Sequence, residues 1–211
     1  MAAAARTRPS KPRRVTRLKR CRWVPADDPQ YLRYHDEEWG RPVHDDRLLF
    51  EMLILEGAQA GLSWSTVLHK RRGYRRAFAR FNPGRVARID ARGRAALMRE
   101  PGIVRNRLKI ESTVTNARAY LAVQREFGSF DRYLWSFTAG VPLINRPRPG
   151  TVPARTPLSD RISKDLLKRG FRFVGSTIIY AYLQAVGVVN DHTRGCYLCP
   201  KARAGGRRRL K

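Results

Sequence analysis

The stretch LLFEMLILEGAQAGL, residues 48–62, decides the fold class because it is apolar along nearly its whole length. It is longer than an ordinary buried strand, and its Leu, Met, Glu and Ala residues favour a helix. Asp45 and Asp46 stand just before it, where a short carboxylate accepts hydrogen bonds from the first free N–H groups of a helix. The stretch therefore predicts a helix that is buried on nearly all sides.

Further helical patterns follow on the C-terminal side of this stretch. Ser63 begins the next pattern, Pro83 stops it, and Pro101-Gly102 separates the following two. The last pattern is rich in β-branched residues, but its length favours a buried helix over a strand. We predict these further helices over residues 64–81, 85–99, 103–128, 131–137, 159–170 and 172–189.

Two segments read as irregular. Residues 21–42 are rich in aromatic side chains and carry a turn signal at residues 27–29. Residues 138–158 hold five prolines and read as a long surface connection, after which Ser159 caps the next helix. The sequence has no internal repeat, alternating strand pattern or recurring hairpin dipeptide, so we predict an all-α fold.

The charge of the chain points to a polyanionic partner. The sequence has 211 residues, enough for one domain, with 44 Lys and Arg against 17 Asp and Glu and a net charge of +27. Residues 1–20 and 200–211 hold fourteen basic residues and no acid, and we predict them to be disordered basic arms that contact phosphate or merely aid solubility. Residues 21–199, the predicted folded domain, keep +13 without the arms.

Several classes of protein are excluded. Three cysteines (Cys21, Cys196 and Cys199) are too few to staple a secreted scaffold of this size. No apolar run approaches the ~20 residues that span a bilayer, so no membrane partner is expected. Arg6 and Arg8 interrupt the place of a signal peptide, which predicts a cytoplasmic protein; the basic start leaves organellar targeting open as an alternative.

Four residues are of the types that bind zinc. His192 and Cys196 stand in H-x3-C, which on one helical turn would place both side chains on one face, and Cys21 and His35 lie near the other end of the domain. Two thiolates and two imidazoles make a closed, structural site. Spacing alone leaves two alternatives open: Cys199 could replace Cys196, or all of these could be ordinary cysteines and histidines.

Glu56 is the one carboxylate in the C-terminal half of the apolar stretch. Burying a carboxylate is costly unless donors meet it, so a buried Glu56 suggests a ligand site. The alternative places Glu56 at an exposed helix end, and Glu51 is better placed for solvent. Aromatic faces around a carboxylate suit a flat, hydrogen-bonding, cationic ligand such as a nucleobase. The nearby aromatic residues are Trp23, Tyr31, Tyr34, Trp39 and Trp64.

Four stretches together resemble the DNA-3-methyladenine glycosylase I family over about residues 21–196. They are CRWVPADDPQYLRYHDEEWG, LLFEMLILEGAQAGLSW, GIVRNRLKIESTVTNARAYL and KRGFRFVGSTIIYAYLQAVGVVNDHTRGC, in that order. The resemblance implies the all-α fold of the helix-hairpin-helix glycosylases, with one structural zinc ion that joins the two ends of the domain. It also implies excision of 3-methyladenine from alkylated DNA by hydrolysis of the N-glycosidic bond.

The resemblance assigns roles to individual residues. It makes Glu56 the pocket carboxylate that binds the methylated base, Tyr34 a contact of the same base, and Trp64 the ring that stacks on it. Tyr31, Trp39 and Trp23 line the pocket. The zinc ligands that it implies are Cys21, His35, His192 and Cys196.

Its DNA contacts fall on two turns. Gln59 and Leu62 would probe the gap that the extruded nucleotide leaves in the duplex. Residues 102–109 match the hairpin that grips the DNA backbone, with Arg105 where the wider superfamily has a second glycine. The residues expected to contact DNA there are Gly102, Arg105, Arg107 and Lys109.

The expected chemistry follows from the substrate. A base leaves only after flipping out of the stack, and 3-methyladenine is cationic in DNA and departs as a neutral base. The superfamily's catalytic aspartate has no counterpart, since Glu111 lies within an amphipathic helix. We therefore expect Glu56 to support the developing sugar cation in a monomeric, monofunctional enzyme without a lyase step. The alternatives are a non-catalytic binder of alkylated or single-stranded nucleic acid and a basic RNA-binding protein.

Overall fold

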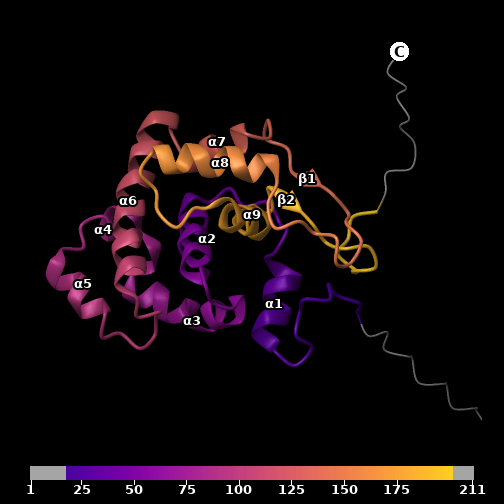
Figure 1. Cartoon of the computed structure of the whole chain (residues 1–211), viewed down its shortest axis with the longest axis horizontal. Coiled ribbons are helices and arrows are strands. Elements are labelled where there is room, and N and C mark those ends of the chain that lie inside the picture. Colours follow the sequence, from indigo (N-terminus) through magenta and orange to yellow (C-terminus); the bar gives the residue numbers. More distant parts are fainter. Residues whose placement is uncertain (1–17, 202–211) are drawn as a thin grey trace, which may run out of the picture.

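The computed structural model describes residues 18–201, which form a largely helical body (Figure 1). The elements in chain order are α1 (Pro29–Glu37), α2 (Asp46–Gln59), α3 (Trp64–Ala77), the 3₁₀ turn η1 (Ala79–Phe81), α4 (Pro83–Val86), α5 (Ala91–Leu97), α6 (Arg107–Phe127), α7 (Phe130–Ser136), β1 (Leu143–Ile144), α8 (Pro157–Lys168), α9 (Ser176–Ala185) and β2 (Val189–Asn190).

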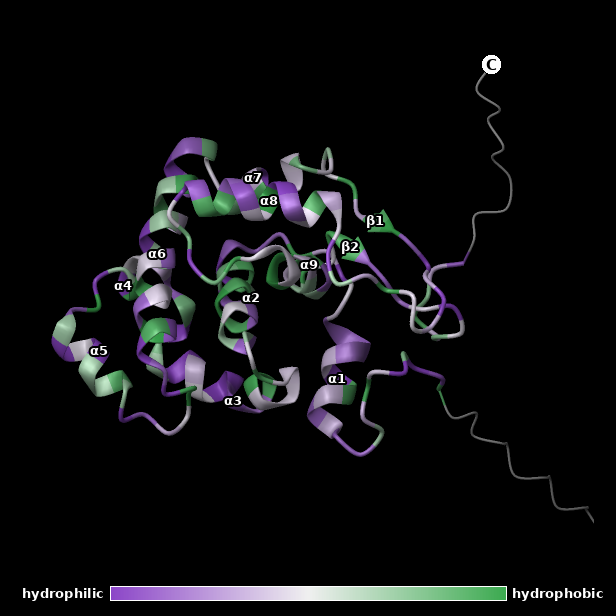
Figure 2. Cartoon of the chain, viewed as in Figure 1, coloured by the Kyte–Doolittle hydropathy of each residue, from purple (hydrophilic) through white to green (hydrophobic). Residues whose placement is uncertain are grey.

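Helix α2 lies at the centre of the molecule, as its composition predicts. The side chain of Asp45 accepts a hydrogen bond from the Leu48 N–H and caps the helix. The helix packs against α3, α6, α7 and α9, and Figure 2 shows α2 and α9 as mostly hydrophobic between more polar outer helices. The prediction of a buried helix is confirmed; among its residues with no more than 1% exposure are Leu49, Phe50, Leu53 and Leu55.

Helix α1 corrects the prediction that residues 21–42 are irregular. The Asp28 side chain accepts hydrogen bonds from the N–H groups of Gln30 and Tyr31, and Pro29 occupies the first helical position. Asp-Pro is a turn signal, but it is equally the start of a helix, because proline has no N–H to leave unpaired there. The aromatic residues that follow therefore have helical spacing.

The predicted helices over residues 64–81 and 85–99 are each interrupted. Helix α3 ends at Ala77, since residues 79–81 have φ between +50° and +54°, outside the right-handed helical region. The segment 85–99 divides into the short helices α4 and α5 instead of forming one helix.

Other helix bounds also differ from the prediction, and α9 covers Ser176–Ala185 instead of residues 172–189. Helix α6 begins at Arg107, capped by Asn106, rather than at residue 103. Thr156, not Ser159, caps α8: the Thr156 side chain accepts from the Ser159 N–H and the Ser159 side chain accepts from the Thr156 N–H. Ser159 thus completes a capping box from inside the helix.

A two-stranded parallel sheet modifies the all-α prediction. Leu143 pairs with Val189 and Ile144 with Asn190, so β1 lies within the proline-rich connection of residues 138–158. The sheet fastens this connection to the segment that leads into His192.

Glu51 is buried, which corrects the prediction that it faces solvent. Its carboxylate accepts hydrogen bonds from Arg71 and Arg75 of α3, and Arg71 also donates to Glu38 at 2.6 Å. These ion pairs join α2, α3 and the end of α1, which is why a carboxylate is tolerated there.

The ends of the described chain are fastened to the body. Arg20 donates to Asp36 at 2.6 Å, and the Tyr197 N–H donates to the Lys19 carbonyl at 2.8 Å. The predicted basic arms otherwise lie outside the described residues. Within residues 18–201, no helix has both the length and the apolar character needed to cross a bilayer.

Candidate active site

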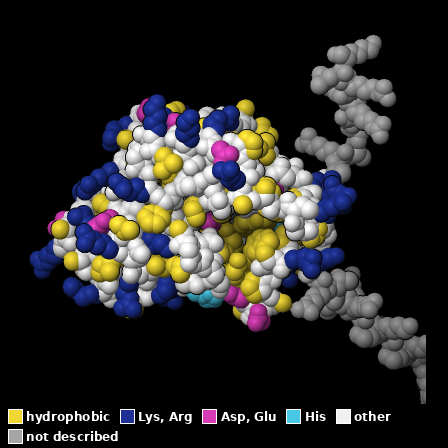
Figure 3. Space-filling model, in the orientation of Figure 1, with side chains coloured by type: hydrophobic (Ala, Val, Ile, Leu, Met, Phe, Trp, Pro, Cys, Tyr) yellow, Lys and Arg dark blue, Asp and Glu magenta, His cyan; other side chains and the backbone are white. Residues whose placement is uncertain are grey.

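A hollow of about 200 Å³ opens on the face shown in Figure 3, where hydrophobic side chains gather below the surface. Helix α1 contributes two tyrosines, the segments flanking α1 contribute two tryptophans, and α3 contributes its first residue. All five aromatic residues that the sequence singled out thus come together. The complete lining is Trp23, Tyr31, Tyr34, Trp39, Trp64, Val152 and Gln184.

The rings differ in exposure. Tyr34 and Trp64 are buried, with ring centroids 5.1 Å apart. Trp23 is 39% exposed, and its ring lies 4.8 Å from Trp39 and 5.7 Å from Tyr31. The hollow therefore has a buried inner part and an accessible aromatic rim, which suits a flat ring.

Glu56 is buried on α2, and the alternative of an exposed helix end is wrong. Within the described chain its Oε2 has no hydrogen-bond partner, and burial raises the pKa of the carboxyl from 4.5 to about 8. Burial, followed by the charge of Glu56, raises the pKa of Tyr31 to about 12, and the pKa of Tyr34 also rises. Glu56 is not among the residues that line the hollow, but its charge acts on the two tyrosines that do.

A second buried polar atom beside the hollow also lacks a partner among the described residues. It is the indole Nε1 of Trp64, and it can only donate, whereas an ionised Glu56 can only accept. An unpaired buried polar group costs about 1–3 kcal/mol. A ligand with both a donor and an acceptor would relieve the cost at both places.

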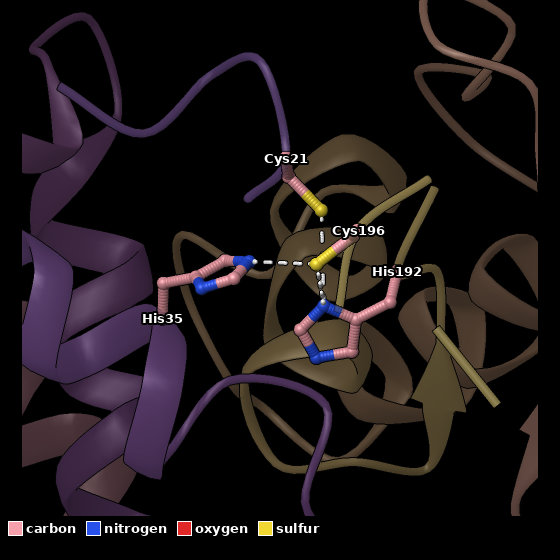
Figure 4. A group of neighbouring side chains, drawn as sticks. All are labelled: Cys21, His35, His192 and Cys196. Atoms are coloured by element: carbon pink, nitrogen blue, oxygen red, sulfur yellow. Dashed lines mark hydrogen bonds between the residues drawn. The ribbon is translucent and has the colours of Figure 1, made fainter. Parts of the chain in front are cut away.

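Cys21, His35, His192 and Cys196 form one buried cluster (Figure 4), with donor atoms within 4.8 Å of one another. The Cys196 Sγ lies 3.5 Å from His35 Nε2 and 3.6 Å from His192 Nδ1, and the Cys21 Sγ lies 3.7 Å from His192 Nδ1. Tetrahedral bonds of about 2.0–2.3 Å place neighbouring ligand atoms roughly 3.3–3.8 Å apart. The cluster therefore fits a metal ion.

Neighbouring groups orient the two imidazoles of this cluster. His35 Nδ1 lies 2.8 Å from Asp36 Oδ1, and His192 Nε2 lies 3.2 Å from the Trp39 carbonyl. A carbonyl only accepts, so His192 Nε2 carries the proton and its Nδ1 is free to bind a cation. A hydrogen bond from Arg20 lowers the pKa of Asp36 to about 2, which keeps a carboxylate beside His35.

The H-x3-C segment is not the helical turn that its spacing suggested. The Cys196 N–H donates to the Thr193 carbonyl at 2.9 Å, and Gly195 has φ of +93°, so a tight turn brings Cys196 back to His192. Cys199 lies outside the cluster and is half-buried. Of the two cysteines that the spacing left open, Cys196 is therefore the one in the cluster.

The residues expected to contact DNA lie on two turns. Gln59 ends α2, and the following Leu62 is 40% exposed. Gly102 packs against α3, where a Cβ on Gly73 would lie 2.1 Å from the Gly102 carbonyl oxygen. Contact with DNA stays a prediction for these residues and for the exposed Arg105 and Arg107.

Lys109 differs from its neighbours in this segment. Its side chain is 9% exposed, and its ammonium donates to the carbonyls of Ala58 and Ala60 at 2.8 and 2.7 Å. The hairpin and the end of α2 are joined by these bonds.

Two residues of the hollow escaped the sequence analysis. Gln184 is a polar residue within the apolar helix α9, the same signal that drew attention to Glu56. The side-chain nitrogen of Gln184 donates a hydrogen bond to Asp191 at 2.6 Å. The side-chain carbonyl oxygen of Gln184 takes no part in that bond. Val152 carries no such signal, because a single valine in a proline-rich connection is ordinary.

The buried Glu56, whose Oε2 has no partner among residues 18–201, and the aromatic rings of the hollow are features of a protein that binds a flat, hydrogen-bonding ring. The methyladenine glycosylase family model matches residues 23–199. The chain belongs to this family.

Relatives of known name support this assignment. The chain is 46% identical to DNA-3-methyladenine glycosylase 1 of Escherichia coli (strain K12) over 184 residues, which cover 87% of this chain and 98% of the relative. A crystal structure of a 3-methyladenine DNA glycosylase I is 49% identical, with a TM-score of 0.83, and covers 86% of this chain and 100% of its own. A variant of such an enzyme in complex with 3-methyladenine is 38% identical, with a TM-score of 0.80, and covers 83% and 95%.

Proposed function

We propose that this protein is a DNA repair glycosylase that removes 3-methyladenine from alkylated DNA by hydrolysing the N-glycosidic bond, the first step of base excision repair. The names of its relatives support this activity. The observation that carries the proposal is the buried Glu56, whose Oε2 has no partner in the described chain and whose charge acts on Tyr31 and Tyr34 of the aromatic hollow. The site has a place for a base that donates hydrogen bonds and carries positive charge.

The reaction needs little help at the leaving group. A base must flip out of the duplex before excision, which costs a few kcal/mol and least at a lesion. 3-Methyladenine is cationic in DNA and leaves as a neutral base, so no residue has to protonate it. Glu56 and Tyr34 orient the base, Trp64 stacks on it, and the carboxylate stabilises the positive charge that develops on the sugar. Water then completes hydrolysis, and no lyase step follows.

The DNA grip is proposed to be a helix-hairpin-helix made by α5, the turn at residues 98–106 and α6. The contact between α5 and α6 and the backbone contact of Gly102 with α3 support it. Arg105 and Arg107 would meet phosphates, while Gln59 and Leu62 would enter the gap left by the flipped nucleotide. We propose a monomeric domain over residues 21–199 that works on cytoplasmic DNA, with basic arms that add phosphate contacts.

The cluster of Cys21, His35, His192 and Cys196 is proposed to hold one zinc ion. Two sulfur and two nitrogen donors are a ligand set that zinc prefers, and here they lie within 4.8 Å of one another. Four protein ligands leave no open position, so the ion would supply structural stability and take no part in excision.

The activity is tested with methylated duplex DNA and chromatography of the released bases. The protein should release 3-methyladenine, and Glu56→Gln, which keeps the shape and removes the charge, should lower kcat by roughly 100-fold. Glu126→Gln removes an exposed carboxylate on α6 and is the matched control. Wild-type turnover in Glu56→Ala would contradict the role of the carboxylate. Tight duplex binding by the wild-type protein without release would favour the non-catalytic binder.

A further inference from the structure

Lys109 combines a position in the proposed DNA-gripping segment with a side chain that turns inward. It lies in the first turn of α6, yet it is only 9% exposed, whereas Arg105 and Arg107, which precede it, are exposed. Its Nζ donates to the carbonyls of Ala58 and Ala60, which are 51 and 49 residues away in the sequence. An ammonium engaged in this way is not presented to a phosphate.

The two carbonyls belong to the end of α2, where a helix has no N–H groups left to pair with them. A cation at this end also meets the negative pole of the helix. Lys109 therefore satisfies two acceptors with one charged donor group, and such charge-assisted hydrogen bonds are stronger than neutral ones. Burial lowers the pKa of the ammonium.

The turn that follows has little else to hold it. The Ala60 N–H reaches the Gly57 carbonyl only at 3.4 Å, and the Leu62 N–H donates to the Gln59 carbonyl at 2.6 Å. Gly61 has φ of +75°, and a Cβ added there would have no atom within 4 Å. The side chain of Leu62 is 40% exposed. Within the described chain, the Leu62–Gln59 bond and the two bonds from Lys109 are therefore the short hydrogen bonds that hold this turn.

This turn links the parts of the proposed active site. Glu56 precedes Ala58 by two residues, Gln59 and Leu62 lie on the turn, and Trp64 begins α3 directly after it. The other end of the Lys109 connection is the first turn of α6, directly after the hairpin.

We propose that Lys109 is a positioning residue: its ammonium holds the turn from Ala58 to Leu62 in the shape that presents Gln59 and Leu62 to the DNA duplex, and it couples that turn to the hairpin. The inference rests on the proposed glycosylase function. It replaces the expectation that Lys109 contacts a phosphate, and the two roles have different consequences for kinetics and salt dependence.

The first test measures excision and duplex binding by Lys109→Met, which keeps the length of the side chain and removes the donors. For a positioning residue, kcat on methylated duplex should fall by roughly 10- to 100-fold, as expected for a small misplacement of binding groups. The slope of log Kd against log salt should equal that of the wild type. Arg107→Met, two residues away on the exposed side, is the comparison: loss of a phosphate contact should make the slope shallower by about 0.9.

The second test is a double-mutant cycle with Leu62→Ala. If Lys109 acts through the turn, Lys109→Met should have little further effect on kcat once Leu62 is truncated, whereas independent sites multiply their effects to within about twofold. Lys109→Arg keeps a cation with several donors and should restore most of the activity. A general loss of stability would instead lower activity by the same factor in both backgrounds.

Three results would overturn the inference. They are a salt slope shallower by about 0.9 with unchanged kcat in Lys109→Met, multiplicative effects in the cycle, and wild-type behaviour of Lys109→Met in both tests. The wild-type protein separates these from failure of the proposed function: if it releases no 3-methyladenine, the glycosylase activity itself is refuted.

Discussion

The carboxyl of Glu56 shows how burial prepares a side chain for its ligand. Without a partner in the described chain and with a pKa of about 8, it is mostly protonated at neutral pH while the hollow holds no base. A cationic base, or one that donates hydrogen bonds, favours the ionised form. Burial also raises the pKa of Tyr34, so the phenol stays a neutral donor beside it. Ligand binding and ionisation of Glu56 are therefore coupled.

The raised pKa of Glu56 predicts a pH dependence of stability. A group whose pKa is higher in the folded state contributes its full stabilisation of the fold at pH values below its unfolded pKa of 4.5. This stabilisation is lost as the pH rises to the folded pKa of about 8. Glu56→Gln removes this loss, so its free energy of unfolding relative to wild type should improve between pH 5 and pH 8.5, at about 1.4 kcal/mol per pKa unit. Urea denaturation at both pH values measures it.

The control for this prediction is Glu126→Gln. The hydrogen bond from Arg169 lowers the pKa of Glu126, so its ionisation state is constant over the same pH range. Equal pH profiles for wild type and Glu56→Gln would show that the Glu56 carboxyl is not desolvated in solution.

At the scale of elements, the crossing of α3 with the turn at Gly102 sets where the hairpin lies. Gly73 is buried on α3, and the Gly102 backbone occupies the space of its missing side chain. Tyr74, the next residue of α3, accepts a hydrogen bond from the Val104 N–H at 3.3 Å. The hairpin is thus seated directly on the helix whose first residue is Trp64.

Gly73→Ala should displace the hairpin from α3. The added Cβ would lie 2.1 Å from a backbone oxygen, which neither helix nor turn can avoid without moving. We expect a loss of roughly 1–3 kcal/mol in the free energy of unfolding and weaker duplex binding. Gly84→Ala on α4 is the matched control, since its Cβ would meet its nearest atom at 3.4 Å. Equal thermal stability of Gly73→Ala and Gly84→Ala would contradict the packing argument.

At the scale of the whole molecule, the Cys/His cluster joins the two ends of the described chain. Cys21 precedes α1, His35 lies on α1, and His192 and Cys196 follow β2 (Figure 4). Helix α1 carries Tyr31 and Tyr34 of the hollow, but its element contacts are mainly with α3. A metal ion in the cluster would hold the aromatic wall of the hollow against the rest of the body.

Removal of the proposed zinc should therefore loosen this side of the molecule. Elemental analysis of the purified protein should find one equivalent of zinc, and Cys196→Ser should lose the metal together with several degrees of Tm, because metal binding contributes to folding free energy. Cys199→Ser should keep both, since Cys199 lies outside the cluster. A stable, metal-free wild-type protein would refute the zinc site.

The sequence by itself determined the parts that depend on neighbours in the chain. The buried helix around residues 48–62 and its cap at Asp45 follow from composition and spacing, because helical hydrogen bonds and caps join residues three or four positions apart. The turn signal at residues 27–29 is ambiguous in the sequence, because Asp-Pro begins helices as well as turns. The resemblance placed the four metal-type ligands and the aromatic residues of the hollow, which spacing alone left open.

Only the tertiary structure decided the partners of the buried charges. Glu51 pairs with Arg71, which is 20 residues away in the sequence, and Lys109 donates to the Ala58 carbonyl, which is 51 residues away. Glu56 lies on the same helix as Glu51, but its Oε2 has no partner in the described chain. These outcomes depend on which helix faces pack against each other. The local sequence pattern around a charged residue does not reveal whether its partner is solvent, another side chain or a ligand.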